Sequence, residues 1–294
     1  MSKRPFLRTN FGLINQSQFN KSEITAYTEG GRKSFSIVQI DKGEFNATSV
    51  DINFWKEILK IHGCNRKIYF KAIGSKTSGD ELTQRIIDGK VTNTLIFKDK
   101  DLDNYLEKYI PHPSIIYTKG YSWENDVFTK ENIVQIISDY IFDEVPLNHK
   151  LLIEKNFKDL EKIGDKLLRL ELIFRSHGIR FLTNISGEEL IKNGEINIDS
   201  LIRKIKKIAL NNDIQRPFKY IKVRHSFNFY QDCYGKIFES ISYHLTVSIL
   251  KELIDIKNFS KDIFQRNALR IFFNTLKENK DTYYQTVAEN INAA

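Results

Sequence analysis

The sequence of 294 residues contains only two cysteines, Cys64 and Cys233, which are far apart along the chain. So few cysteines exclude a disulfide framework and a CxxC zinc site, and they favour a reducing, cytoplasmic environment. Long apolar runs are missing too, since none approaches the ~20 residues that a membrane-spanning helix needs. The basic N-terminus is not followed by an apolar segment of signal-peptide length. We therefore expect a cytoplasmic protein that has no membrane partner.

Common catalytic signatures are also absent. The sequence has no glycine-rich phosphate loop of the Walker type, so the chain is not expected to be a P-loop ATPase itself. It has no Gly-x-Ser-x-Gly motif and no cysteine–histidine pairing that would indicate acyl chemistry. The six histidines show no metal-ligand spacing, and His62, His225 and His244 stand in surroundings typical of packed side chains.

The composition supports a folded protein with a polyanionic partner. Apolar residues make up 41% of the chain and aromatic residues 12%, which is enough for hydrophobic cores. The formal net charge is +8, and lysines and arginines gain affinity for nucleic acids by releasing phosphate counterions. A lysine-rich composition alone gives the same charge, so the charge does not assign the partner.

The first half of the chain alternates between strand and helix patterns. Residues 24–40 predict a β-hairpin, because two segments rich in β-branched and aromatic residues flank Gly30-Gly31. From Asp51 the apolar spacing is helical, and Gly63 is a candidate C-cap. Alternating helices and strands are typical of a parallel α/β sheet. The remaining elements expected in this half are strands at 67–73, 94–97 and 114–118 and a helix at 80–88.

After about residue 130 the apolar spacing is mainly helical. We place an approximate domain boundary near Val145-Pro146. The expected organisation is an N-terminal arm over 1–23, an α/β domain over 24–145 and a mainly helical, basic domain over 146–294 that binds nucleic acid and partners. The helices expected in this half are 131–142, 147–175, 198–210, 237–253 and 264–277.

A pair of aspartates follows the predicted strand at 94–97. In an extended segment residues i and i+2 point to the same side, so Asp99 and Asp101 can grip one cation. The carboxyl edge of a parallel sheet is also where such folds bind ligands. Oxygen ligands favour Mg²⁺ or Mn²⁺, which can activate water and clamp a phosphodiester. The same aspartates are equally typical of a solvated turn that caps a helix.

Two further acids stand at comparable places. Asp51 lies at a junction between a strand and a helix, and Glu124 comes just after the predicted strand at 114–118. With the pair at Asp99 and Asp101, these positions give three acidic loops in turn. Such an arrangement indicates a metal-binding rim.

The order of four short motifs resembles the Toprim-type nuclease family that includes the nuclease subunit of the PARIS phage-defence system. The resemblance covers residues 44–135. It implies a Toprim-like domain and Mg²⁺- or Mn²⁺-dependent cleavage of RNA, with tRNA as the best candidate. It also implies the effector of an abortive-infection system, a homodimer that an ABC-type ATPase partner restrains until infection. The motifs are Asp51-x-x-Phe54-Trp55, Gly74-Ser-Lys76, Asp99-x-Asp101 and Tyr121-Ser-Trp-Glu124-Asn125.

One position departs from the family pattern. Family members carry a glutamate at the end of the first strand, four residues before the aspartate that Asp51 matches, and this chain has Ala47 there. The resemblance makes that glutamate a metal ligand or a general acid–base group. Three explanations stay open: a naturally inactive variant, an engineered inactive form of a toxic nuclease, or another register in which Glu29 or Glu44 supplies the carboxylate.

The resemblance assigns roles to individual residues. Asp51, Asp99 and Asp101 would be the metal ligands. Glu124 would be a further carboxylate of the same catalytic site, and Ala47 marks the glutamate position. A non-catalytic Toprim-like module that binds nucleic acid or protein is the rival hypothesis, which Ala47 favours, and a DNA-directed nuclease is a third.

A basic cluster stands in the C-terminal half. Between Arg203 and Arg224 the one acid is Asp213, and the aromatic residues Phe218 and Tyr220 are interleaved. Basic side chains can hold phosphates while aromatic side chains stack on unpaired bases. The solvated face of an amphipathic helix and a strand would give the same pattern. The candidate nucleic-acid-binding residues are Lys76, for which a surface lysine is the simpler interpretation, and Arg203, Lys204, Lys206, Lys207, Arg216, Lys219, Lys222 and Arg224.

Overall fold

The computed structural model of the protein describes residues 22–184, 191–192, 195–214, 225–256 and 258–293. They divide into two compact units, which we call the sheet unit and the helical unit. The sheet unit contains the described residues of Met1–Asp99, Ile110–Thr118 and Thr275–Ala294, and the helical unit contains those of Lys100–Tyr109 and Lys119–Asn274. This division differs from the expected boundary near Val145, because the chain changes unit after residues 99, 109, 118 and 274.

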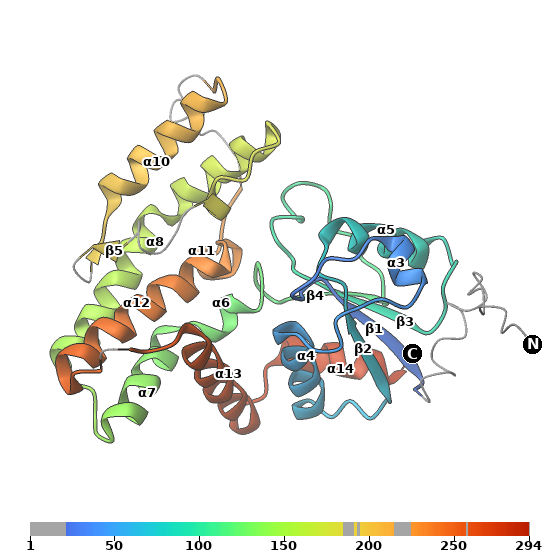
Figure 1. Ribbon diagram of the computed structural model, residues 1–294, viewed down its shortest axis with the longest axis horizontal. Coiled ribbons are helices and arrows are strands. Elements are labelled where there is room, and N and C mark those ends of the chain that lie inside the picture. The colour runs from blue at the N-terminus through green and yellow to red at the C-terminus, as the bar shows by residue number, and fades with distance from the viewer. Residues whose placement is uncertain (1–21, 185–190, 193–194, 215–224, 257, 294) are drawn as a thin grey trace, which may run out of the picture. The chain divides into compact units, whose positions relative to one another are not determined.

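Four parallel strands form the sheet, in the order β2-β1-β3-β4 (Figure 1). The central strands β1 and β3 are buried along their whole length, as is typical of a sheet covered on both faces. The expected parallel α/β architecture is thus confirmed. The strands are β1 (Ile24–Thr28), β2 (Ile68–Ala72), β3 (Thr94–Lys98) and β4 (Ile115–Tyr117), and the helices of this unit are α3 (Ile37–Asp41), α4 (Val50–Ile61), α5 (Lys76–Ile87) and α14 (Thr282–Ala293).

The hairpin expected over 24–40 is wrong. The segment begins with strand β1, but it ends in the short helix α3, which starts with a capping box between Ser36 and Gln39. Strand β1 pairs in parallel with β2 on one side and β3 on the other, so a second hairpin strand has no place beside it. Gly30 and Gly31 therefore belong to a loop that leaves the sheet.

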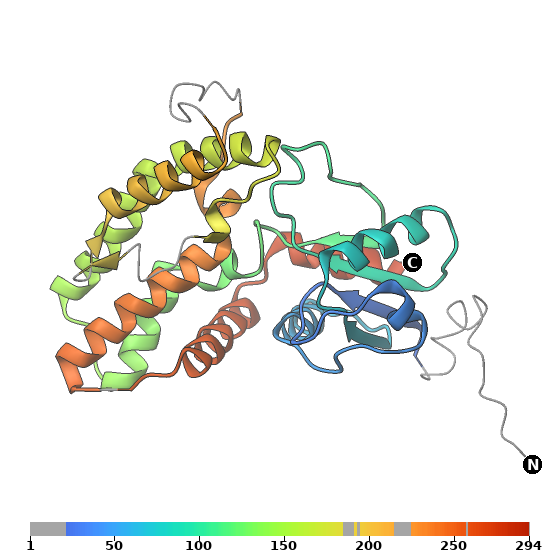
Figure 2. The same cartoon turned by 45° about the horizontal axis from the view of Figure 1, so that its top comes forward.

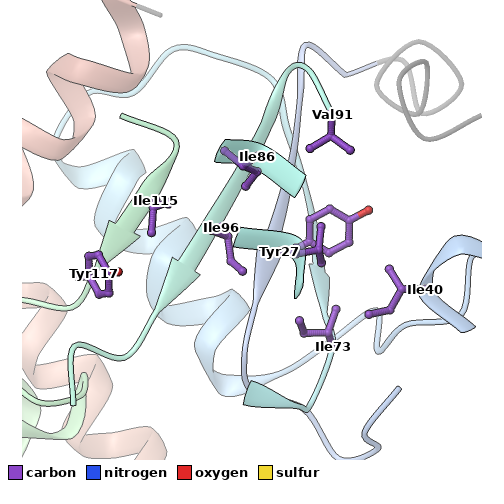
Figure 3. Close-up of a cluster of buried hydrophobic side chains, with 9 residues drawn as sticks. Tyr27, Ile40, Ile73, Ile86, Val91, Ile96, Ile115 and Tyr117 are labelled. Carbon is purple, nitrogen blue, oxygen red and sulfur yellow. The ribbon is translucent and has the colours of Figure 1, made fainter. Parts of the chain in front are cut away.

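One face of the sheet packs against α3 and α5. The cluster of buried side chains there includes Tyr27 of β1, Ile96 of β3 and Ile86 of α5, and Ile40 of α3 joins it (Figure 3). Side chains alternate between the two faces of a strand, so Tyr27 and Ile96, which pair in the register, point to this same face.

The other face packs against α4 and α14. Ser49 caps α4 by accepting a hydrogen bond from the Ile52 N–H at 3.0 Å, and the apolar stripe expected for this helix is buried. The Trp55 ring of α4 lies 4.5 Å from the Phe97 ring of β3 and 5.9 Å from the Tyr284 ring of α14, between centroids. This contact explains why the last helix of the chain belongs to the sheet unit and not to the expected C-terminal domain.

The helical unit confirms the mainly helical character expected for the second half. Its longest helix is α8, and α12 packs against α7 (Figure 2). None of the described helices of the protein is long and apolar enough to cross a membrane. The elements are α6 (Glu124–Val127), α7 (Lys130–Ile141), α8 (Leu147–Ser176), η1 (Leu182–Asn184), β5 (Ile191–Lys192), β6 (Glu195–Ile196), α10 (Ile198–Asn211), α11 (Phe229–Asp232), α12 (Gly235–Ile254) and α13 (Lys261–Glu278), whose last residues enter the sheet unit.

Candidate active site at the carboxyl edge of the sheet

Acidic residues follow the two central strands of the sheet. Glu29 comes directly after β1 and Asp99 directly after β3, and the register pairs Thr28 with Phe97 near the ends of these strands. Because adjacent parallel strands end at the same edge, both acids stand at the carboxyl edge, where α/β folds bind ligands.

A buried lysine connects Glu29 to a second acid. Lys98 Nζ lies 3.4 Å from Glu29 Oε1 and 2.6 Å from Asp80 Oδ1 of α5. Only 4% of the Lys98 side chain is exposed, whereas Asp80 is 58% exposed. The lysine therefore bridges a carboxylate at the sheet edge and a carboxylate that reaches solvent.

Opposing effects act on the pKa of Lys98. Burial, the largest effect, lowers this pKa, but the charge of Glu29 and the hydrogen bond and charge of Asp80 raise it above its ordinary value. The ammonium group is therefore charged at neutral pH and compensates carboxylates at this edge.

Two glycines let carboxylates approach the backbone closely. A Cβ atom at Gly30 would overlap the Asp51 carboxylate, so this first-turn acid of α4 fills the space beside Gly30. A Cβ atom at Gly79 of α5 would lie 2.9 Å from Glu29 Oε1, closer than real side-chain contacts allow. The structure thus brings Glu29 and Asp51 to the same end of β1.

Ala47 does not follow a strand. Its neighbour Asn46 makes an isolated antiparallel bridge with Ala72, and α4 begins soon afterwards at Val50. The interpretation of Ala47 as the position after the first strand does not hold in this fold, because the first strand is β1 and Glu29 follows it. The sequence register measured the spacing to Asp51 along the chain, whereas in the structure Asp51 meets the end of β1 through space.

The two other predicted acids, Asp101 and Glu124, belong to the helical unit. Asp101 has a left-handed backbone with φ of 50°, and its N–H donates to the Tyr121 carbonyl at 2.8 Å. Burial raises the pKa of Tyr234, Lys236 lowers it, and the charges of Glu124 and Asp101 raise it further. These two carboxylates therefore lie close enough to raise the pKa of the same tyrosine.

A buried arginine cluster in the helical unit was not predicted. Arg175 Nε donates to Glu171 Oε1 at 2.7 Å, and Arg175 Nη2 donates to the Tyr121 hydroxyl at 2.7 Å. The second Glu171 oxygen accepts the N–H groups of Phe181 and Leu182. The spacing of Glu171 and Arg175 on one helix face was visible in the sequence, but their other partners are distant along the chain.

The predicted basic cluster is described only in part. Its first members belong to α10, where Arg203, Lys206 and Lys207 are exposed and Lys204 is half-buried. Lys76 is the first residue of α5 and is half-buried. The remaining predicted residues, Arg216, Lys219, Lys222 and Arg224, lie outside the described residues.

The described part of the chain does not gather three His, Cys, Asp or Glu side chains as a set of metal ligands. The sheet unit has Glu29, Asp51 and Asp99 at or beside its carboxyl edge. Lys98 and Asp80, which were not predicted from the sequence, pair at the same edge. Among known proteins, no family model matches the chain and no curated protein is significantly similar to it.

Proposed function

We propose that this protein is a metal-dependent nuclease whose catalytic carboxylates belong to the carboxyl edge of the sheet. The observation that carries the proposal is the position of Glu29 and Asp99 directly after the adjacent parallel strands β1 and β3. Asp51, packed against Gly30, adds a third carboxylate at the end of β1. A glutamate after one strand and an aspartate, Asp99, after its neighbour resemble the Toprim-type arrangement.

The donor chemistry of this edge fits Mg²⁺ or Mn²⁺. Carboxylate oxygens are hard ligands, and Mg²⁺ commonly binds through one or two carboxylates while water and substrate phosphates complete its shell. Glu29 and Asp99 would hold the ion, and water and substrate phosphates would complete its shell. A bound ion would supply Lewis-acid activation of water and of the phosphodiester.

Lys98 would position Glu29 for this chemistry. Its ammonium group holds one Glu29 oxygen at 3.4 Å and is itself held by Asp80 at 2.6 Å. The positive charge offsets the repulsion between carboxylates that gather at one edge. Glu29 would then present its other oxygen to the metal or to water.

The substrate and the regulation follow from the resemblance and the net charge of +8. We propose RNA as the substrate, with tRNA as the best candidate, and a homodimer that an ABC-type ATPase partner restrains until phage infection. The exposed basic residues of α10 would help to bind the RNA.

A nucleic-acid-binding module without catalysis is the second candidate function. The observation that favours it is the ion pair between Lys98 and Glu29, because this pair already compensates the charge of one proposed metal ligand. Such a module would bind RNA equally well with or without a divalent metal.

Nuclease activity tests the proposal directly. The full chain is incubated with RNA and with DNA in Mg²⁺, in Mn²⁺ and in EDTA, beside Glu29→Gln, Asp99→Asn and the matched control Glu57→Gln. Glu57 is an acid of α4 that pairs with Lys60 on the surface, so its neutralisation should leave activity unchanged. We expect metal-dependent cleavage of RNA that falls about 100-fold or more in the two edge variants.

Each outcome separates the candidates. Loss of cleavage in Glu29→Gln and Asp99→Asn alone supports the nuclease, whereas RNA binding without cleavage in any metal supports the binding module. If Ala47→Glu creates an activity that the unchanged chain lacks, the catalytic glutamate belongs at position 47 and the assignment of Glu29 is wrong.

A further inference from the structure

The loop that leaves β1 carries two exposed basic residues beside the candidate catalytic acids. It runs Gly30-Gly31-Arg32-Lys33-Ser34, directly after Glu29, and both Arg32 and Lys33 are exposed. The sequence pattern predicts nucleic-acid binding at Lys76 and in the C-terminal half, and it assigns no role to this loop.

The backbone of this loop is fixed by the chain around it. The Lys33 N–H donates to Asn46 Oδ1 at 3.2 Å, and Asn46 Nδ2 donates to the Lys33 carbonyl at 2.8 Å. The Gly74 N–H donates to the Gly30 carbonyl at 3.0 Å, and the Ser34 hydroxyl donates to the Gly74 carbonyl. Gly74, with φ of 66°, has no room for a Cβ atom because the Lys33 carbonyl lies against it.

Arg32 and Lys33 differ from several other basic residues of the sheet unit in their charge partners. Neither side chain forms an ion pair with any residue that the structure describes. Four basic side chains of this unit, for example, pair with acids: Lys60 with Glu57, Arg66 with Glu23, Arg85 with Asp41 and Lys90 with Asp88. Two adjacent cations thus stand on a fixed backbone at the edge that also carries the candidate acids. Both are available to bind an anionic ligand.

We propose that Arg32 and Lys33 form a phosphate clamp that holds a nucleic-acid strand at the carboxyl edge of the sheet. This inference rests on the proposed nuclease function and names residues with which the sheet unit would bind its substrate. An arginine guanidinium can bind a phosphate through two parallel hydrogen bonds, and a neighbouring lysine adds a point charge for the next phosphate. The cations also offset the repulsion between phosphates and the carboxylates of Glu29, Asp51 and Asp99.

The fixed backbone makes the clamp more effective. A loop that is ordered before binding loses less conformational entropy when the strand arrives. Contacts to phosphates position a strand without reading its sequence, so the clamp would set where the strand crosses the edge and would not set base preference.

Salt-dependent binding tests this inference without relying on cleavage. A fluorescent single-stranded RNA is titrated with the full chain in EDTA at several salt concentrations, and anisotropy gives the dissociation constant. Because each phosphate contact to a single strand contributes about 0.7 to the slope of log affinity against log salt, Arg32→Gln/Lys33→Gln should reduce the slope by about 1.4. Binding at low salt should weaken about tenfold.

The matched control removes the same charge from the opposite edge. Lys60, in the last turn of α4, and Lys67, just before β2, are both exposed at the amino edge of the sheet. Lys60→Gln/Lys67→Gln should change the slope by much less. Asn46→Ala keeps both cations and removes the bonds that fix Lys33, so it should weaken binding while the slope stays that of the unchanged chain.

The outcomes distinguish this inference from the proposed function. If the unchanged chain binds and cleaves RNA but Arg32→Gln/Lys33→Gln keeps its slope, the clamp is wrong and the nuclease stands. Equal losses in the two double variants would mean that only net charge matters, which also overturns the clamp. If the unchanged chain binds neither RNA nor DNA, the proposed function and the clamp are both wrong.

Discussion

The sheet unit and the helical unit each bury a basic side chain between acids, but the two clusters differ in their access to water. Lys98 and Arg175 are themselves almost completely buried. The partners of Lys98 reach the surface, since Glu29 is 12% exposed and Asp80 is 58% exposed, whereas Glu171, the partner of Arg175, is 0% exposed. Of two chemically similar clusters, only the cluster of Lys98 can meet a ligand without unfolding part of its unit.

The cluster of Arg175, Glu171 and Tyr121, which we call the closed cluster, has the features of a structural element. Arg175 is shared between Glu171 and the Tyr121 hydroxyl, and Glu171 also accepts the N–H groups of Phe181 and Leu182, at the start of η1. Such a hydrogen-bonded buried pair holds a helix and the following segment in one arrangement. The cluster of Lys98, Glu29 and Asp80, which we call the open cluster, differs from it. Its Glu29 carboxylate directly follows the central strand β1, as the proposed function requires.

The largest effect should come from breaking the closed cluster. Arg175→Met leaves the Glu171 carboxylate buried without its cation, and we expect the free energy of unfolding to fall by about 3–5 kcal/mol. Urea unfolding followed by circular dichroism measures the loss. The control is Lys158→Met on the same helix, whose exposed pair with Glu154 should contribute less than about 1 kcal/mol. Equal losses in the two variants would show that Arg175 is not a structural centre.

A medium effect should come from crowding the open edge. Gly30→Ala places a methyl group where the Asp51 carboxylate lies, and overpacking of this kind costs about 1–3 kcal/mol. In an Asp51→Ala background the same change should cost much less, because the overlapping atoms are gone. A double-mutant cycle from urea unfolding gives the coupling. Additive losses in the cycle would mean that Asp51 does not lie against Gly30 in solution.

The elements that local pattern determines could be predicted from the sequence. The buried apolar runs before Asp99 and at 114–118 became strands, and the apolar spacing after Asp51 became α4. Propensity and periodicity suffice in these segments because each one meets the core with a regular face. Helix α14 escaped prediction because its packing against α4 joins opposite ends of the chain.

The candidate site could be predicted only in part, because it depends on strand order. The aspartates at 99 and 101 stood out as a motif, but the choice between Glu29 and Ala47 needed the knowledge that β1 lies between β2 and β3. The hairpin predicted from Gly30-Gly31 was wrong for the same reason. Gly30-Gly31 is a strong hairpin signal along the chain, whereas in space Gly30 makes room for Asp51.

The smallest effect on stability should come from changing Lys98 in the open cluster. This variant tests most directly whether the open and closed clusters differ in function. Lys98→Met should lower the free energy of unfolding by about 1–2 kcal/mol, less than Arg175→Met, because the exposed Asp80 carboxylate can turn to water. Mn²⁺ binding followed by electron paramagnetic resonance should nevertheless change, since Glu29 loses the contact that positions it. Asp80→Asn keeps the contact between Lys98 and Glu29 and should alter Mn²⁺ binding less. If Lys98→Met destabilises the fold as strongly as Arg175→Met and leaves Mn²⁺ binding unchanged, both clusters are structural, and exposure of the partners does not mark a functional site in this protein.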